Sequence, residues 1–115
     1  MMSDRELLEL AAKAMEIDVR WIDEWNGFFI HRPHKLPGEW PMWNPLTDDG
    51  DALRLAVKLE MQVYVGSHTV VAEILSDSDE PSIWQKVFVE NDTYAATRLA
   101  IVRAAAEIDK ATEDQ

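Results

Sequence analysis

Three aspartates stand close together at Asp48, Asp49 and Asp51, and carboxylate oxygens are the ligands that Ca²⁺ prefers in proteins. A calcium loop wraps around its ion with about 6–8 oxygens and closes with a glutamate at a fixed spacing. Here the run lacks that spacing and leads directly into an apolar pattern of helical period from Ala52. We therefore expect the aspartates to cap a helix and stabilise its N-terminal dipole, and not to hold a metal ion.

Two histidines, His31 and His34, offer the other common type of metal ligand. They lie in a proline-rich segment and not one turn apart on a helix, as in the H-E-x-x-H motif of zinc proteases. A third ligand would have to be His68 or an acid, and no spacing points to one. We expect the histidines to lie at the surface or in caps. A metal-dependent enzyme that uses them together with acids is kept as a minor alternative.

Other catalytic signals are missing from the sequence. The chain has no cysteine, which excludes disulfides, thiolate zinc sites and cysteine nucleophiles and fits a reducing compartment. It also has no phosphate-binding loop, no dinucleotide fingerprint and no G-x-S-x-G motif. We therefore expect a protein that is not an enzyme and needs no cofactor.

The net charge of −11 bears on the class of partner. Residues 1–40 hold eight acids and five bases, residues 41–75 five and two, and residues 76–115 nine and four, so the acidity is spread along the chain. Without a basic stripe, direct binding to nucleic-acid phosphates is disfavoured. The acidity could serve solubility alone, or it could meet a basic protein partner.

Four tryptophans, Trp25, Trp40, Trp43 and Trp84, could form a stacking platform for bases or peptides. In a domain of this size most aromatic side chains belong to the core, and a platform for bases would lack basic residues around it. An exposed patch for a protein partner is the better functional interpretation. Three acids lie in a polar loop, where we otherwise expect them to be solvated. With them, the candidate interaction residues are Trp25, Trp40, Trp43, Asp77, Asp79 and Glu80.

Length and composition indicate one globular domain over residues 1–115, in which residues 110–115 form a frayed tail. Hydrophobic residues make up 47% of the chain, too many for a disordered protein. No stretch approaches the roughly 20 apolar residues that span a bilayer, and the charged N-terminus lacks a signal core. We expect a soluble cytoplasmic protein with no membrane contact.

Local signals predict the elements that position these residues. Ser3 and Glu6 have the spacing of a capping box, so a helix should run from there to about Glu16. Asn26 and Gly27 predict a two-residue hairpin turn. The strands expected around that turn are residues 17–21 and 28–30, and the residues 31–46 that follow should form a proline-rich loop lying over the core as a lid.

The second half should begin with a helix capped by Thr47 or Asp48. Its expected apolar face comprises Ala52, Leu53, Ala56, Val57 and Leu59. The elements expected after it are strands at residues 61–65, 69–75 and 83–90 and a helix from Asn91-Asp92-Thr93 to about Asp109, in which Ala104, Ala105 and Ala106 allow close packing.

This order, α-β-β-α-β-β-β-α, predicts an α+β fold with three helices. We expect an α-β-α sandwich whose sheet, antiparallel or mixed, has about four to five strands. Residues 83–90 have two rather apolar faces, which favours helices on both sides of the sheet.

Three stretches carry a family resemblance, and the first of them, residues 3–14, resembles the start of such proteins. Residues 43–52, WNPLTDDGDA, resemble the W-N-P-x-x-D signature of the phage ABA sandwich domain family, and residues 93–108 resemble its closing helix with a recurring A-I-x-R-A-A pattern. The resemblance implies an α-β-α sandwich and a bacteriophage or prophage protein at work in the bacterial cytoplasm. The family has no established activity, so no catalytic or binding residues carry over.

These observations lead to one main hypothesis and one main alternative. The main hypothesis is a non-enzymatic phage or prophage accessory protein whose acidic surface binds a basic host or phage protein. The alternative is a self-associating structural domain, in which the alanine-rich last helix or an exposed strand edge forms a symmetric homodimer.

Overall fold

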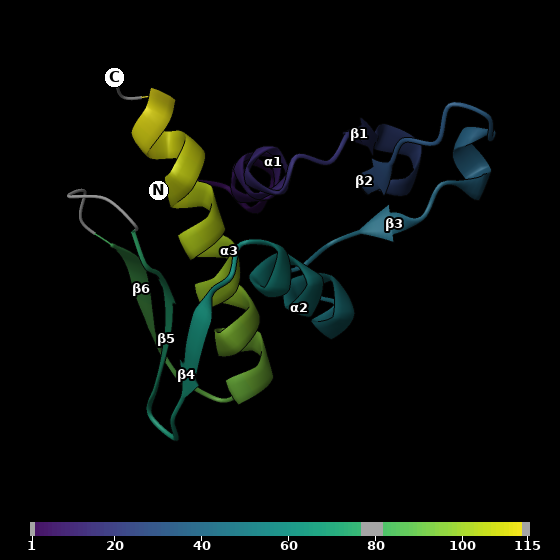
Figure 1. Ribbon diagram of the computed structural model, residues 1–115. Coiled ribbons are helices and arrows are strands. Elements are labelled where there is room, and N and C mark those ends of the chain that lie inside the picture. Colours follow the sequence, from purple (N-terminus) through teal and green to yellow (C-terminus); the bar gives the residue numbers. More distant parts are fainter. Residues whose placement is uncertain (1, 77–81, 114–115) are drawn as a thin grey trace.

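The structure, a computed structural model, describes residues 2–76 and 82–113. It contains three helices and two separate three-stranded antiparallel sheets, ordered β1-β2-β3 and β4-β5-β6 (Figure 1). The elements are α1 (Asp4–Met15), β1 (Val19–Ile22), β2 (Gly27–Ile30), β3 (Met42–Trp43), α2 (Asp49–Lys58), β4 (Gln62–Val65), β5 (Thr69–Ile74), β6 (Ile83–Phe88) and α3 (Thr93–Glu113). The predicted α+β class and the three helices are confirmed, whereas the single sheet of four to five strands is wrong.

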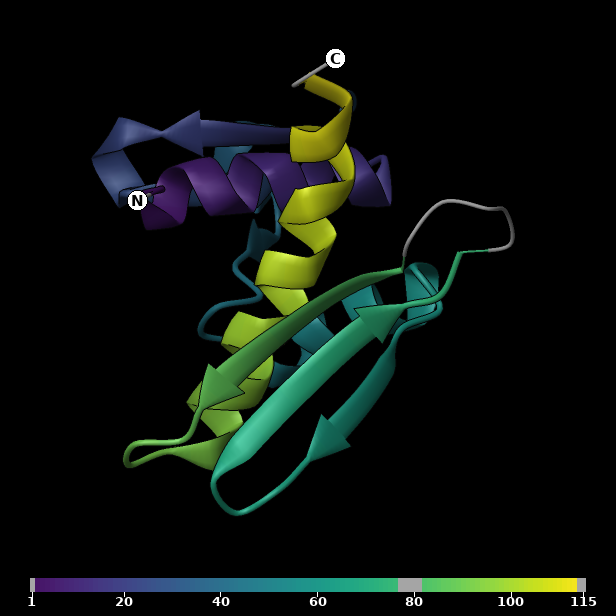
Figure 2. The same ribbon diagram turned by 90° about the vertical axis from the view of Figure 1, so that its left-hand side faces the viewer.

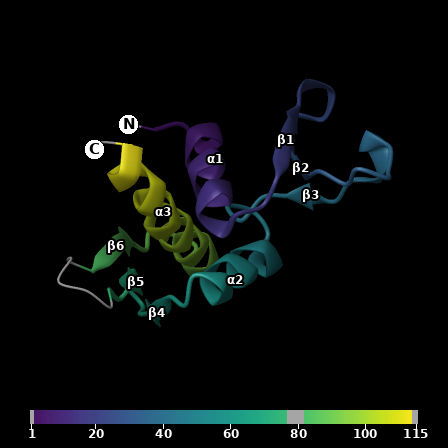
Figure 3. The same cartoon turned by 45° about the horizontal axis from the view of Figure 1, so that its top comes forward.

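Helix α1 begins and ends where its capping residues predict. The Ser3 hydroxyl oxygen accepts a hydrogen bond from the Glu6 backbone amide at 3.2 Å and donates to the Glu6 carboxylate at 3.1 Å. Glu16 adopts a left-handed conformation with φ 60°, and its amide donates back to the last turn, which ends the helix. The apolar face of α1 then packs across α3, as Figure 3 shows.

The first sheet is a small arm that extends beyond α1, away from α3 (Figures 1 and 3). Its hairpin was predicted, but a 3₁₀ turn at Asp23–Trp25 and Asn26 with φ 47° replace the expected two-residue turn. Strand β3, in which Trp43 lies opposite Phe28 of β2, was not predicted. The segment expected to be only a lid therefore returns to the sheet as a strand before α2 begins.

Helix α2 buries only part of its predicted face, with Leu59 packed against the core, and it also buries Leu55. Leu55 is completely buried, whereas Leu53 is 64% exposed and Val57 is exposed as well. Ala52 and Ala56 are buried as expected. The expectation that Leu53 and Val57 belong to the core is therefore wrong, because both side chains stay exposed to solvent and Leu55 is the leucine that enters the core.

Helix α3 is the central element of the core and packs against α1, α2 and the second sheet (Figure 1). Its alanines Ala104, Ala105 and Ala106 are fully buried, which confirms that they allow close packing. These three alanines therefore pack inside the chain and are not exposed at its surface. The helix continues to Glu113, past the expected end near Asp109.

The second sheet is covered on one side only. Helix α3 packs on the face formed by Val70, Ala72 and Val87. Figure 2 looks onto the opposite face, which no helix covers. The expectation of helices on both sides of this sheet is therefore wrong for the described part of the chain. Within that part, no helix is both long and apolar enough to cross a membrane.

Candidate interaction surfaces

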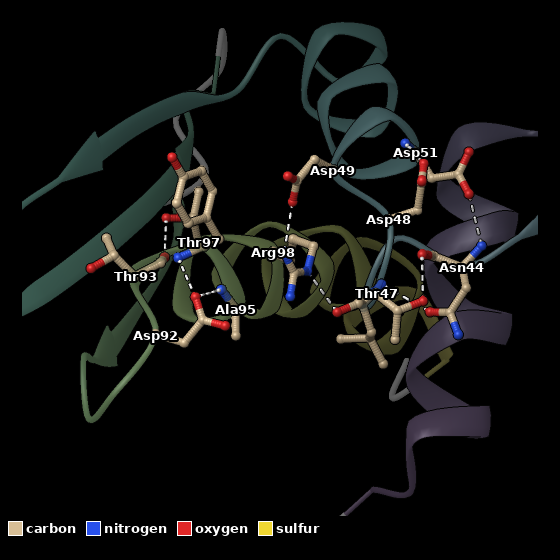
Figure 4. Close-up of polar contacts among 12 residues, drawn as sticks. Asn44, Thr47, Asp48, Asp49, Asp51, Asp92, Thr93, Ala95, Thr97 and Arg98 are labelled. Atoms are coloured by element: carbon tan, nitrogen blue, oxygen red, sulfur yellow. Dashed lines mark hydrogen bonds and ion pairs between the residues drawn. The ribbon is translucent and has the colours of Figure 1, made fainter.

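The acidic run at the start of α2 forms a polar network that closes the turn before the helix (Figure 4). Asp48 caps α2, since its Oδ2 accepts from the Asp51 amide at 2.8 Å. The nearly buried Asp51 accepts from the Asn44 amide at 2.9 Å and pairs with the Arg54 guanidinium at 2.7 Å. The capping role predicted for this run is confirmed for Asp48.

Arg98 of α3 ties the same turn to the core, and no local pattern predicts this contact (Figure 4). Its Nε donates to the Leu46 carbonyl at 2.8 Å, and its Nη1 lies 2.6 Å from Asp49 Oδ1. Each of the three aspartates is thus engaged with an amide or an arginine. Across residues 2–76 and 82–113, no group of three or more histidines and acids is arranged to hold a metal ion.

We expect Arg98→Ala to lower the free energy of unfolding by about 1–3 kcal/mol, because the Leu46 carbonyl and the Asp49 carboxylate both lose their partner. The exposed Lys58→Ala on α2 is the control and should change it by less than about 0.5 kcal/mol. Urea unfolding followed by circular dichroism measures both. Equal losses in the two variants would mean that the Arg98 contacts contribute nothing to stability.

The histidines contribute to loop structure. His31 Nδ1 lies 3.2 Å from Asp18 Oδ2, and its ring packs edge-on against Trp40 with the centroids 4.9 Å apart. His34 is exposed in the loop. A hydrogen bond from the Arg20 guanidinium, together with its charge and that of His31, holds the pKa of Asp18 below its ordinary value. His31 therefore joins a surface ion-pair cluster at the base of the arm.

The structure separates the candidate tryptophans. Trp43 is only 2% exposed, so its assignment to an interaction surface is wrong and it belongs to the core. Trp40 is half-buried, and its indole N–H lies 3.1 Å from the carbonyls of both Arg32 and Lys35, which closes the proline loop. Trp25 is exposed at the tip of the arm, against Phe29.

Trp25 and Trp40 meet along an open groove of about 640 Å³ at the tip of the arm. Trp21 and Pro37 complete its aromatic and apolar lining. The charges around it are mixed, since Arg20 stands among the acids and pairs with Asp18 at 2.9 Å. The other three candidates, Asp77, Asp79 and Glu80, lie outside the described residues.

A second apolar surface lies on the uncovered side of the second sheet. It exposes Tyr64 (56%), Trp84 (57%) and Phe88 (70%), and we call this surface the open aromatic face. The strand register places Tyr64 opposite Val71, and Val71 opposite Lys86, which stands between the other two aromatic residues on β6. Three exposed aromatic side chains thus share the face of the second sheet that looks toward the viewer in Figure 2.

Acidic charge gathers in the same part of the chain. Residues 73–92, which run from β5 through β6 to the start of α3, hold six acids and one base, Lys86. Lys86 extends over the Phe88 ring, with Nζ 5.4 Å from its centroid. The alternation of Trp84, Lys86 and Phe88 on one face is readable in the sequence, but the exposure of that face is not. No family model, curated protein or solved structure matches the chain, so function is inferred from its own surface.

Proposed function

We propose that the chain is a non-enzymatic accessory protein of a bacteriophage or prophage. It acts in the bacterial cytoplasm and binds a basic host or phage protein. The observation that carries this proposal is the open aromatic face, where Tyr64, Trp84 and Phe88 lie exposed on the sheet face opposite α3, which no helix of the described residues covers. The resemblance of residues 43–52 and 93–108 to phage ABA sandwich domains supports the phage origin.

Exposed clusters of aromatic side chains are energetically unfavourable in water unless a partner covers them. Aromatic side chains carry large apolar areas, and contiguous apolar patches on soluble domains usually mark sites of interaction. Tryptophan and tyrosine are also the side chains that contribute most to binding energy when a partner covers them. Trp84 and Tyr64 lie on the two outer strands of the sheet, so one partner surface could contact both.

Charge indicates the kind of partner. The six acids of residues 73–92 lie in the sequence around and between the strands that carry the face. A basic protein would be steered toward them, and its association rate would fall as salt screens the attraction. Catalysis has little support, because the aspartates of α2 serve as a cap and as arginine partners.

We expect the tagged protein to capture one basic protein from bacterial lysate at low salt and to lose most of it at high salt. The double variant Trp84→Ala/Phe88→Ala should bind the purified partner at least about tenfold more weakly, because both aromatic contacts are lost. Trp25→Ala, which removes an exposed tryptophan on the arm, is the matched control and should bind normally.

Both variants change exposed residues, so their thermal unfolding should match that of the parent chain. Unchanged binding by the double variant would contradict a role for the open aromatic face. If Trp25→Ala lost binding instead, the partner site would lie in the groove of the arm.

A further inference from the structure

The backbone edge of β4 takes no part in the proposed function, although the Tyr64 side chain next to it belongs to the open aromatic face. We propose that two copies of this chain associate through their β4 strands and form a symmetric homodimer with one continuous six-stranded sheet. β4 lies at the end of the order β4-β5-β6 and, among the residues that the structure describes, pairs with β5 alone. The inference rests on the backbone, the side chains and the charges at this edge.

The backbone at this edge has hydrogen-bonding groups to offer. The Gly66 amide donates to the Thr69 carbonyl at 2.9 Å, and bonding alternates along an antiparallel pair of strands. The residues of β4 that bond to β5 are therefore Tyr64 and Gln62, opposite Val71 and Glu73. The N–H and C=O groups of Val63 and Val65 then point toward the open edge.

Apolar side chains flank the edge on both sides. On the side of the helices, an open groove of about 540 Å³ is lined by Leu53 of α2, Val65 of β4 and Tyr94 of α3, and all three side chains are exposed. On the other side of the sheet, the exposed Tyr64 ring lies next to the edge. A strand added here would therefore gain apolar contacts above and below the sheet.

The charges favour a second copy of this chain over a basic partner. β4 has no charged residue, α2 has two aspartates and two basic residues, and residues 93–101 of α3 contain only Arg98. This surface thus has no excess of negative charge, although the whole chain has a net charge of −11. A basic protein would find no electrostatic attraction here, whereas a second acidic chain could approach without facing concentrated like charge.

The strand geometry fits a two-fold axis at Tyr64. With that axis, Val63 of each copy lies opposite Val65 of the other, and each such pair exchanges both of its free backbone hydrogen bonds. The two Tyr64 residues then form the closely spaced pair that makes no backbone hydrogen bonds. An isologous contact of this kind closes on itself and leaves no free β4 edge.

Light scattering tests the association directly. At micromolar protein concentration we expect a mass of twice 13.2 kDa. Salt should strengthen the dimer, because it screens the repulsion between the two acidic chains. Val65→Lys should give the mass of one chain, because it places a charge in the contact. Phe88→Lys changes another exposed apolar residue, on the opposite edge strand β6; it is the control and should remain dimeric. A wild-type monomer throughout this range, or a Val65→Lys dimer, would overturn the proposal.

Cross-linking tests the two-fold axis, because the parent chain has no cysteine. In Tyr64→Cys the two introduced thiols would face each other at about 4.5 Å between Cα atoms, within the range that a disulfide accepts. Mild oxidation should convert this variant to a covalent dimer. Trp84→Cys on β6 is the matched control, since the parent side chains are 57% and 56% exposed at Trp84 and Tyr64. Equal cross-linking of both variants, or none in Tyr64→Cys, would place the axis elsewhere and overturn the proposal.

Discussion

Replacing Trp43 with alanine should lower the free energy of unfolding by about 3–5 kcal/mol. The indole is nearly completely buried, and Trp43 pairs with the buried Phe28 in the first sheet. Removing it leaves a large cavity where the arm joins the core, at the point where the chain enters the turn before α2. Because small domains are stable by about 5–15 kcal/mol, this one substitution should remove a large fraction of the total.

Urea unfolding followed by far-ultraviolet circular dichroism measures this loss without depending on tryptophan fluorescence. Trp25→Ala is the matched control, because it removes an exposed indole from the turn between β1 and β2 and should cost less than about 1 kcal/mol. If Trp43→Ala does not fold, Trp43→Phe keeps an aromatic ring and should show a smaller loss in the same direction. A loss under about 1 kcal/mol for Trp43→Ala would contradict burial of the ring.

Leu55→Ala should lower the free energy of unfolding by about 2–5 kcal/mol, whereas Leu53→Ala should lower it by less than about 1 kcal/mol. The two leucines lie two residues apart on α2, so each controls for the other in helix propensity and chemistry. Leu55 is fully buried against the core, and Leu53 is exposed on the opposite side of the helix.

The comparison should be made at a protein concentration low enough that association does not add to stability, since Leu53 lines the surface beside β4. The same urea titration measures both variants. A larger loss for Leu53→Ala than for Leu55→Ala would mean that α2 packs with the face suggested by its apolar spacing and not with the face that contains Leu55.

The helix starts were predictable because capping acts within one turn of chain. Ser3 caps α1, Asp48 caps α2, and Asp92 accepts hydrogen bonds from the amides of Tyr94 and Ala95 at the start of α3. Each contact joins residues two or three positions apart. The side chain and its backbone partner are therefore both visible in a short stretch of sequence.

The face of α2 that is buried could not be predicted in the same way. Apolar residues at positions 52, 53, 55, 56, 57 and 59 cover most of the helix circumference, so a helical period fits more than one face. Packing in the core buries Leu55 and leaves Leu53 and Val57 exposed. The choice depends on how α2 docks on the rest of the core, which includes α3, and α3 begins more than thirty residues after α2 ends.

The candidate surface was predictable only in part. The alternation of residues 84, 86 and 88 indicates that Trp84 and Phe88 share a face, but a second layer of helices was expected to cover it. Trp43 and Trp25 have the same side chain, yet the first is buried in strand β3 and the second is exposed in the turn between β1 and β2. Exposure is a property of what packs nearby, and residue type does not encode it.

The sequence by itself determined the α+β class, the three helices with their caps, and the hairpin of the arm, because these depend on hydrogen bonds and periodicities within a few residues. The tertiary structure alone decided that the strands divide into two sheets and that one sheet face and the β4 edge stay uncovered. It also decided that Arg98 holds Leu46 and Asp49, across about fifty residues of chain. Such contacts form only when the core brings distant segments together, so no local pattern specifies them.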